Sequence, residues 1–242
     1  SAILPGAGEY YAKSYWKTAL FVTIEIAALT GYFVYENRGN DEDRRMRNFG
    51  DEHWSEQRYW SRVYQLALEN GLWNYDPLET TQDNKQNISD EYYTAENIAR
   101  LRDLEGTAQW RGFTHSLPET KTQQYYEMIY KYLHQFGVGW DDVSSLTNGN
   151  LESAWTYYDI HANLGNLSPN IEKYRSMRNQ SNDYYSTATT MLNLMLLNHV
   201  LSAFDAAFAV KQYNKQINYA VRVNSQFDGF NRVTTYGLHV SW

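Results

Sequence analysis

An apolar tract near the C-terminus constrains the fold of this chain more than any other feature. The tract covers residues 191–210 and, as a helix, is long enough to cross a bilayer. A second tract, residues 19–35, follows the N-terminus. Both tracts contain polar or ionisable side chains, which are costly in apolar surroundings unless they face one another or water. We therefore expect two apolar helices that pack together through these side chains.

The polar side chains of the two tracts form the candidate site. Asn198, Ser202 and Asp205 follow an i, i+4, i+7 spacing and share one helix face, and His199 lies beside them. Glu25, near the middle of the first tract, is their natural partner. Two interpretations stay open. The group is either a hydrogen-bonded lock between the two helices or an ion site or proton relay.

Composition limits how much of the chain a membrane can hold. The mean hydropathy of −0.67 is too polar for a bundle of many spans, so at most the two tracts are embedded. The net charge of −7 argues against nucleic acid as a partner. The absence of cysteine excludes disulfides and thiolate chemistry. The 22 tyrosines and 8 tryptophans suit membrane or protein interfaces, or a packed core.

A helical period of 3.6 residues runs through most of the chain. The first predicted helix covers residues 7–36, stops at residues 37–40, and begins with the tyrosines and lysines typical of a membrane-surface collar. A charged helical stretch follows at residues 41–69. Ser168 and Pro169 start a long helix that ends near Tyr213. Shorter helices are expected over residues 89–106, 116–136 and 151–163, with a polar loop at residues 74–87.

The period changes to two after residue 217, which predicts a β-hairpin with a turn at Asp228 and Gly229. A lone two-stranded hairpin is marginally stable, so its open edges should be covered by helices or by another subunit. Its alternating side chains are the candidate self-association residues. They are Tyr219, Val221, Tyr236, Leu238, Val240 and Trp242.

These patterns predict a mainly α-helical fold. It is a helical bundle with two apolar helices of transmembrane length, a polar helical head and a C-terminal β-hairpin. The regions are an N-terminal apolar helix at 1–40, a polar helical region at 41–182, a second apolar helix at 183–213 and the hairpin at 214–242.

Motifs for catalysis, metals and cofactors are missing from the sequence. The segment with His53 and Glu56 is not a zinc-binding HExxH motif, and Asp141 and Asp142 lack the spacing of a calcium loop. A P-loop, a GxGxxG turn and a GxSxG elbow are also missing. We expect no catalytic residue, metal or cofactor. Tyr-Tyr pairs about thirty residues apart leave a helical repeat as a lesser alternative.

Four segments together resemble a family of bacterial envelope proteins classified as a domain of unknown function. They are LPGAGEYYAKSYWKTALF, LPETKTQQYYEMIYKY followed by GWDD, YRSMRNQSND and NHVLSAFDAA. The resemblance spans most of the chain, to about Tyr213. It implies an upstream signal peptide, membrane-associated helices and a Gram-negative setting, and it brings no catalytic residues. The hairpin ending in Trp242 also resembles the terminal strand of outer-membrane proteins, although two strands cannot close a barrel.

The expected function is that of a non-enzymatic structural protein of the bacterial envelope, periplasmic, associated with the outer membrane or at the cell surface. It would assemble with copies of itself and contact membrane lipid, but not nucleic acid. One alternative is an accessory subunit of a membrane complex or a component of an ion- or proton-coupled transporter. A second alternative is a helical-repeat adaptor that binds peptides.

Overall fold

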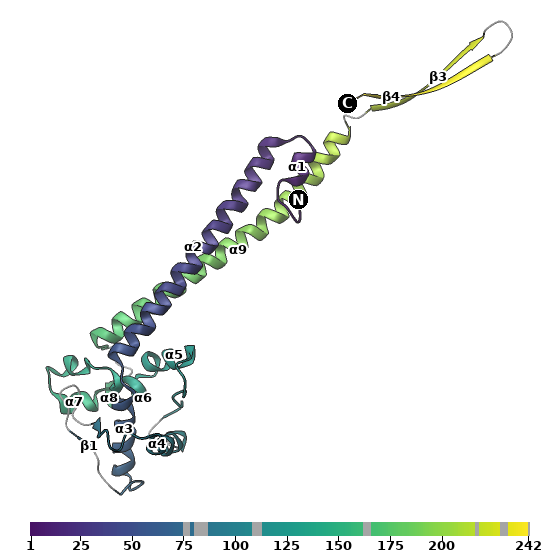
Figure 1. Cartoon of the computed structure of the whole chain (residues 1–242). Helices are drawn as coiled ribbons and strands as arrows, with labels where there is room; N and C mark the ends of the chain where they lie inside the picture. Colours follow the sequence, from purple (N-terminus) through teal and green to yellow (C-terminus); the bar gives the residue numbers. More distant parts are fainter. Residues whose placement is uncertain are drawn as a thin grey trace. The chain divides into compact units, whose positions relative to one another are not determined.

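The computed structural model describes residues 1–74, 78–79, 87–107, 113–161, 166–215, 218–227 and 232–241. The chain divides into two compact units (Figure 1). The first contains Ser1–Arg38 and Tyr184–Trp242, and the second contains Gly39–Asp183. Most of the described chain is helical, two long helices are apolar, and an antiparallel hairpin lies near the C-terminus. The predicted fold class is therefore confirmed.

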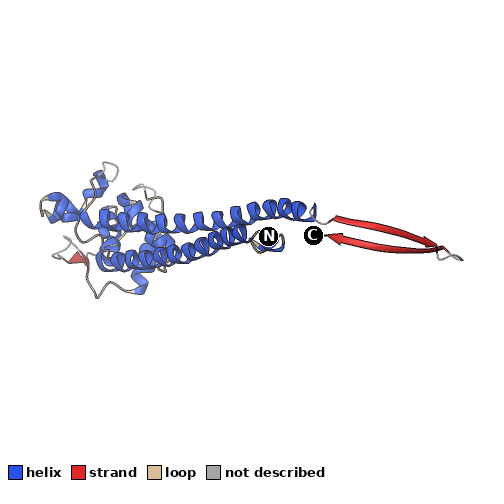
Figure 2. Cartoon of the chain, turned by 90° about the horizontal axis from the view of Figure 1, so that it is seen from above, coloured by secondary structure: helices blue, strands red, loops and turns tan. Residues whose placement is uncertain are grey.

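The first unit is built from a short helix and parts of two long ones. Helix α1 covers Ala7–Tyr11, α2 covers Tyr15–His53 and α9 covers Pro169–Lys215, and both long helices continue into the second unit. Within the first unit, α2 and α9 lie side by side in both Figure 1 and Figure 2. Both helices are long and apolar enough to cross a membrane.

The prediction of one helix over residues 7–36 has the correct start, since α1 begins at Ala7, but it misses a break after α1 and places the end too early. The chain leaves the helical conformation after α1, and Lys13 adopts a left-handed φ of 59° before α2 begins. At the other end, α2 continues through residues 37–40 to His53. A single glycine inside a helix costs only about 1 kcal/mol relative to alanine, which packing can offset. Gly39 is buried, and its carbonyl accepts a hydrogen bond from Ser181 of α9 at 3.0 Å.

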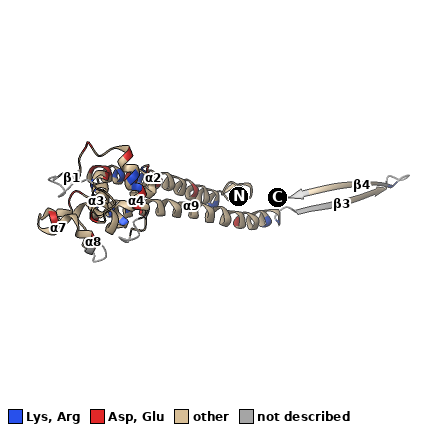
Figure 3. Cartoon of the chain, turned by 90° about the horizontal axis from the view of Figure 1, so that it is seen from below, with Lys and Arg blue, Asp and Glu red and all other residues tan. Residues whose placement is uncertain are grey.

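The second unit contains the charged, water-compatible part of the chain. In Figure 3 the red and blue segments gather in this unit, whereas α2 and α9 are mainly tan within the first unit. Its remaining elements are α3 (Glu56–Glu69), β1 (Leu78–Glu79), β2 (Asn87–Ile88), α4 (Ala95–Thr107), α5 (Gln123–Lys131), α6 (Leu133–Phe136), the 3-10 turns η2 (Gly137–Gly139) and η3 (Val143–Thr147), α7 (Leu151–Trp155) and α8 (Tyr157–His161).

Buried aromatic side chains form the core of the second unit. Several of their polar tips donate to backbone carbonyls, which satisfies buried indole and phenol groups. Trp54 Nε1 lies 2.9 Å from the carbonyl oxygen of Phe136, and Trp140 Nε1 lies 2.7 Å from that of Ile129. In this unit the aromatic residues therefore serve mainly as core.

Several helix boundaries in the second unit differ from the prediction. The stretch 41–69 divides at Ser55, whose hydroxyl accepts the amide of Arg58 and starts α3. The helix expected from residue 116 starts at Gln123 instead, after Thr122 as its cap. Residues 89–106 and 151–163 also hold shorter helices than expected, α4 and the pair α7 and α8, while residues 162–163 lie outside the described residues. The long helix α9 begins at Pro169, as predicted.

The C-terminal hairpin consists of β3 (Asn218–Phe227) and β4 (Arg232–Ser241), the long red strands in Figure 2. Its register is continuous from the pair Asn218 and Ser241 to the pair Phe227 and Arg232. Alternation places Val223 opposite Tyr236 on the same face as Phe227 and Leu238, and all four are exposed. The same face also carries Ser225, Thr234 and Arg232, and the other face is mostly polar. The predicted turn at Asp228 and Gly229, and Trp242, lie outside the described residues.

Candidate functional site

The first unit has its apolar side chains outside and its polar side chains inside. Only 6% of the most apolar window of α2 and 17% of that of α9 is buried. Large apolar residues such as Ile26, Phe33, Leu196 and Phe204 are exposed. Water-soluble helices normally bury such faces, whereas lipid is a suitable solvent for them. The polar seam between the helices is therefore the candidate site.

Glu25 lies at one level of this seam, between α2 and α9. Asn198 Nδ2 donates to Glu25 Oε2 at 3.0 Å and to the carbonyl of Phe21 at 3.0 Å. His199 Nε2 lies 3.0 Å from Glu25 Oε1, while its Nδ1 lies 2.9 Å from the carbonyl oxygen of Ala2. Both ring nitrogens face oxygen atoms, so the protonated imidazole donates to both and forms an ion pair with Glu25.

Ser202 occupies the next level, one turn along α9. Its hydroxyl lies 3.1 Å and 3.2 Å from the two carboxylate oxygens of Glu9, and it accepts the amide of Gly6 at 2.8 Å. Ser1 donates a second hydroxyl hydrogen bond to Glu9 at 2.7 Å. Glu9 is completely buried. The carboxyl group of Glu9, on α1, is therefore bound by two hydroxyl groups, that of Ser1 and that of Ser202 on α9.

Asp205 forms the third level, with Lys17 rather than Glu25. Lys17 Nζ lies 2.7 Å from Asp205 Oδ1, and both side chains are partly exposed. The other carboxylate oxygen of Asp205 is buried and has no hydrogen-bond partner. The expected direct pairing of Glu25 with the whole stripe therefore applies to Asn198 and His199 only. The reason is helix geometry, since the stripe extends along α9 and each turn meets a different residue.

Glu9 and Lys17 are site residues that the sequence analysis missed. Lys17 could have been found, because Lys17, Phe21 and Glu25 follow one another at intervals of four and share the face of α2 that meets α9. Glu9 gave a weaker signal. It reaches the seam only because the chain breaks after α1 and Gly8 packs closely against Ala206.

The seam can act as a lock or take part in proton or ion binding. Two oppositely charged pairs, Glu25 with His199 and Lys17 with Asp205, balance most of its charge. Paired groups satisfy one another in a low-dielectric environment and hold two helices in one register. The buried carboxyl group of Glu9 lies between the two pairs, accepts hydrogen bonds from two hydroxyl groups and has no cationic partner among the described residues.

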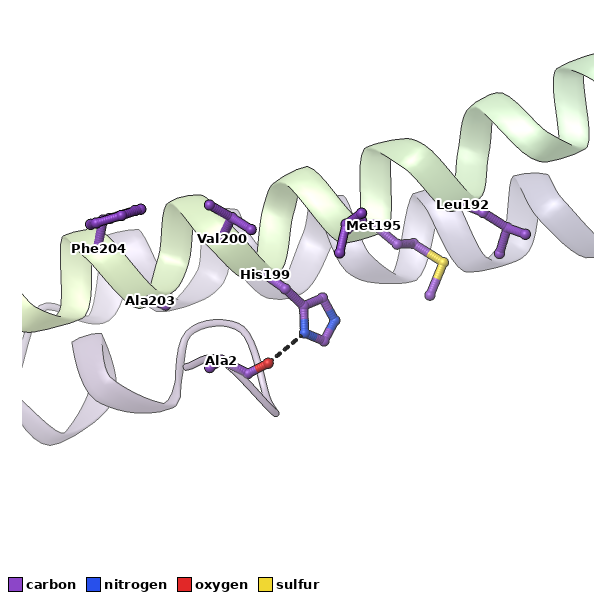
Figure 4. A pocket seen from close by; sticks show the side chains of 8 residues that line it. Ala2, Leu192, Met195, His199, Val200, Ala203 and Phe204 are labelled. Carbon is purple, nitrogen blue, oxygen red and sulfur yellow. Dashed lines mark hydrogen bonds between the residues drawn. The ribbon is translucent and has the colours of Figure 1, made fainter.

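An apolar groove opens on the outer side of α9, beside the seam (Figure 4). Its volume is about 550 Å³, and its walls come from Leu192, Met195, Val200 and Phe204. Figure 4 shows the His199 ring pointing from α9 toward Ala2 at the edge of the groove. The groove lies within the apolar length of α9, where lipid chains would contact it.

The hairpin residues expected to mediate self-association occupy facing register positions. Tyr219 is opposite Val240, Val221 is opposite Leu238, and both pairs alternate in phase with Val223 and Tyr236. Each strand has one edge without a strand partner within the described ranges. The hairpin thus offers one apolar face and two open edges.

The second unit contains a buried polar network around Glu105. The Glu105 carboxylate accepts hydrogen bonds from the hydroxyl of Tyr59, from Gln135 at 3.2 Å and from the amide of Leu117 at 3.1 Å. Burial raises the pKa of Glu105, and the hydrogen bonds and Arg102 oppose that rise only in part. Burial also raises the pKa of Tyr59 well above its usual value. The network ties α3, α4 and α6 together and has a structural role.

Three of the residues considered for metals, His53, Asp141 and Asp142, lie in a hydrogen-bonded cluster in the second unit. His53 Nδ1 lies 2.9 Å from Asp141 Oδ2, and Asn170 donates to Asp141 at 2.8 Å. Asp142 accepts the amide of Asn170 at the start of α9. Among the residues that the structure describes, no group of three or more histidine and carboxylate side chains could hold a metal ion.

The chain matches no known protein family, no curated protein and no solved structure.

Proposed function

We propose that this chain is a structural protein embedded in a membrane of the bacterial cell envelope, that it assembles with copies of itself, and that it has no catalytic role. The observation that carries this proposal is the hairpin, with its exposed apolar face and two open edges. Two strands alone are marginally stable in water, so a partner must complete them. Strand addition by a second copy would satisfy one edge, and a neighbouring copy on each side would satisfy both.

Membrane embedding is supported by the arrangement of the two long helices. At about 1.5 Å per residue, α2 measures about 27 Å from Lys17 to Tyr35, close to the roughly 30 Å hydrocarbon core of a bilayer. Aromatic and basic side chains lie at both ends of this length, including Trp16 with Lys17 and Tyr35 with Arg38. Because each helix would cross once, the hairpin and the second unit would face opposite sides.

The crossing is tested by labelling single cysteines, since the native chain has none. Asn224→Cys in the hairpin and Glu91→Cys in the second unit are both exposed positions. In sealed vesicles, a membrane-impermeant maleimide should label one of them and reach the other only after the vesicles are opened. Equal labelling of both from outside, or release of the chain by carbonate, would refute a two-helix crossing.

Self-assembly is tested by the mass of the purified chain in detergent. We expect a homogeneous oligomer that Leu238→Glu dissociates, because the substitution puts a charge on the apolar face. Thr235→Glu, on the opposite face of the same strand, is the matched control and should leave the oligomer intact. Removal of residues 217–242 should abolish assembly. A stable monomer of the native chain would overturn the proposal.

An accessory subunit of a membrane complex, or an ion- or proton-coupled transporter component, is the second candidate. It is favoured by the carboxyl groups of Glu9, Glu25 and Asp205, which all lie in the seam. An accessory subunit would copurify with other polypeptides in fixed proportion. An ion site would make thermal stability depend on cation concentration, and Asp205→Asn or Glu9→Gln would remove that dependence.

The envelope setting is part of this proposal: the membrane-length helices support a membrane location, and the resemblance described above suggests which one. A signal peptide upstream, a Gram-negative source and a periplasmic, outer-membrane or surface location belong to the proposal. Spanning helices are typical of the inner membrane, whereas outer-membrane spans are usually closed barrels. Fractionation of inner and outer membranes would locate the protein.

A further inference from the structure

A second pocket in the first unit lies where α2 begins and near the end of α9. Its volume is about 270 Å³, and its walls come from the break before α2 and from the last turns of α9. That volume is about nine times the roughly 30 Å³ share of one water molecule in the liquid. The lining residues are Ala12, Lys13, Ser14, Lys17, Phe208, Ala209, Gln212 and Tyr213.

The polar lining is rich in groups that can donate hydrogen bonds. Two ammonium groups, from Lys13 and Lys17, line the pocket together with the hydroxyl of Ser14 and the amide of Gln212. Lys17 is held by Asp205, but an ammonium group has three N–H donors and retains some for a ligand. Lys13 has no carboxylate partner among the described residues, and its ammonium lies 5.7 Å from the ring centre of Tyr213. These donor groups suit an anion that has several hydrogen-bond acceptor oxygens.

The end of α1 fixes the place of Lys13. Its φ of 59° is left-handed, the conformation of the residue that follows a helix in a Schellman motif. The amide of Lys13 donates to the carbonyl of Tyr10 at 3.0 Å and the amide of Ser14 donates to that of Glu9 at 2.8 Å, which is the hydrogen-bond pattern of this motif. This helix end places a lysine beside the pocket at the break between α1 and α2.

The apolar part of the lining indicates where the anion comes from. Phe208 is 68% exposed and continues the apolar outer surface of α9 that includes Phe204. Tyr10, Tyr15 and Trp16 are also exposed around the same end of the helices. In a membrane this end lies at the level of the headgroups, where phosphate is the prevailing anionic group.

We infer that this pocket binds the phosphate group of a membrane phospholipid, with Lys13 and Lys17 holding the phosphate oxygens and Phe208 against an acyl chain. The inference rests on the proposed membrane embedding and adds a ligand class to it. A soluble phosphate is the other source of the same chemistry, and the experiment separates the two.

Binding is measured by calorimetry on the full chain in lipid-free detergent. The probes are dihexanoyl phosphatidylglycerol, dihexanoylglycerol without phosphate, and inorganic phosphate. We expect saturable binding of the phospholipid, weakened by added salt, and no binding of the phosphate-free lipid. Equal binding of the two lipids would overturn the site. Equally tight binding of inorganic phosphate would overturn the phospholipid as its ligand.

Substitutions of Lys13 test whether its side chain binds the phosphate group. Lys13→Asn keeps a residue compatible with the left-handed backbone but removes the charge, and we expect binding about five-fold weaker, the effect of about 1 kcal/mol per lysine near a membrane surface. Lys13→Arg should retain binding. Lys211→Asn removes a nearby exposed lysine that does not line the pocket and is the matched control. Equal weakening by Lys13→Asn and Lys211→Asn would overturn the site.

Failure of the site and failure of membrane embedding give different results. The Lys13→Asn protein should remain in the carbonate-resistant membrane fraction with native helix content by circular dichroism. If it stays embedded and binds the phospholipid as tightly as the native chain, only the phosphate site is wrong. If the native chain itself is released by carbonate, the embedding and the lipid site both fail.

Discussion

Lys17 Nζ lies 2.7 Å from Asp205 Oδ1, and this ion pair joins the start of α2 to the last third of α9. The pair is partly exposed, whereas Glu25 makes its contacts two turns further along α2. The carboxylates of Glu25 and Asp205 therefore belong to separate levels of the seam and have different partners.

This separation predicts which pairs are energetically coupled. Lys17→Met and Asp205→Leu should each cost about 1–3 kcal/mol, because each leaves one charge without its partner. The double variant should be less destabilised than the sum, with a coupling of at least about 1 kcal/mol. Glu25→Leu combined with Asp205→Leu should be additive. Thermal unfolding in detergent measures the three single and two double variants, and coupling between Glu25 and Asp205 would contradict the geometry.

Asn198 should tolerate an apolar replacement better than an acidic one. Asn198→Leu loses two hydrogen bonds, which contribute about 0.5–1.5 kcal/mol each. Asn198→Asp has the same shape, but it turns a donor into a carboxylate next to Glu25 Oε2 and the carbonyl of Phe21. It should therefore lower the unfolding temperature more than Asn198→Leu. The opposite order would mean that the amide does not face these acceptors.

Gly8 should be intolerant of even one added methyl group. A Cβ atom at Gly8 would lie 2.5 Å from the Cβ of Ala206, which is closer than carbon atoms can approach. Gly8→Ala should cost about 1–3 kcal/mol through overpacking. Ala206→Gly should restore most of this loss in the double variant, apart from about 1 kcal/mol for a glycine inside α9. A neutral effect of Gly8→Ala would show that α1 does not dock there.

Glu105 should make the stability of the second unit depend on pH. Burial raises its pKa, so folding favours the protonated carboxyl. Its contribution is full below the unfolded pKa of about 4.3 and is lost as pH rises through the higher folded pKa. The unfolding temperature of the native chain, relative to that of Glu105→Gln, should therefore fall as the pH rises above the unfolded pKa. A constant difference would indicate that Glu105 has an ordinary pKa.

Patterns that depend on neighbouring residues were readable from the sequence. The start of α9 at Pro169 and the hairpin follow from local signals, a cap with proline and a period of two. The face formed by Asn198, Ser202 and Asp205 also follows from spacing alone.

Features that depend on distant residues were not readable. The helix expected from residue 116 begins only at Gln123, and the amide of Leu117 is bound instead by Glu105, twelve residues earlier. The stop expected at Gly39 fails because Ser181 packs against that glycine from α9. Glu9 joins the seam only through the break near Lys13 and the contact of Gly8 with Ala206. Each miss is a case of tertiary packing overriding a local propensity.

The register of β3 and β4 runs from Asn218 to Phe227 without a bulge. A ladder of this kind has a fixed parity, so a single inserted residue would exchange the two faces of every following position on one strand. The backbone groups along both edges would be unchanged by such an insertion. A partner that binds only the main chain at the edge of this hairpin would therefore still bind after the insertion. A partner that contacts the side chains of Val223 and Tyr236 would lose its binding surface.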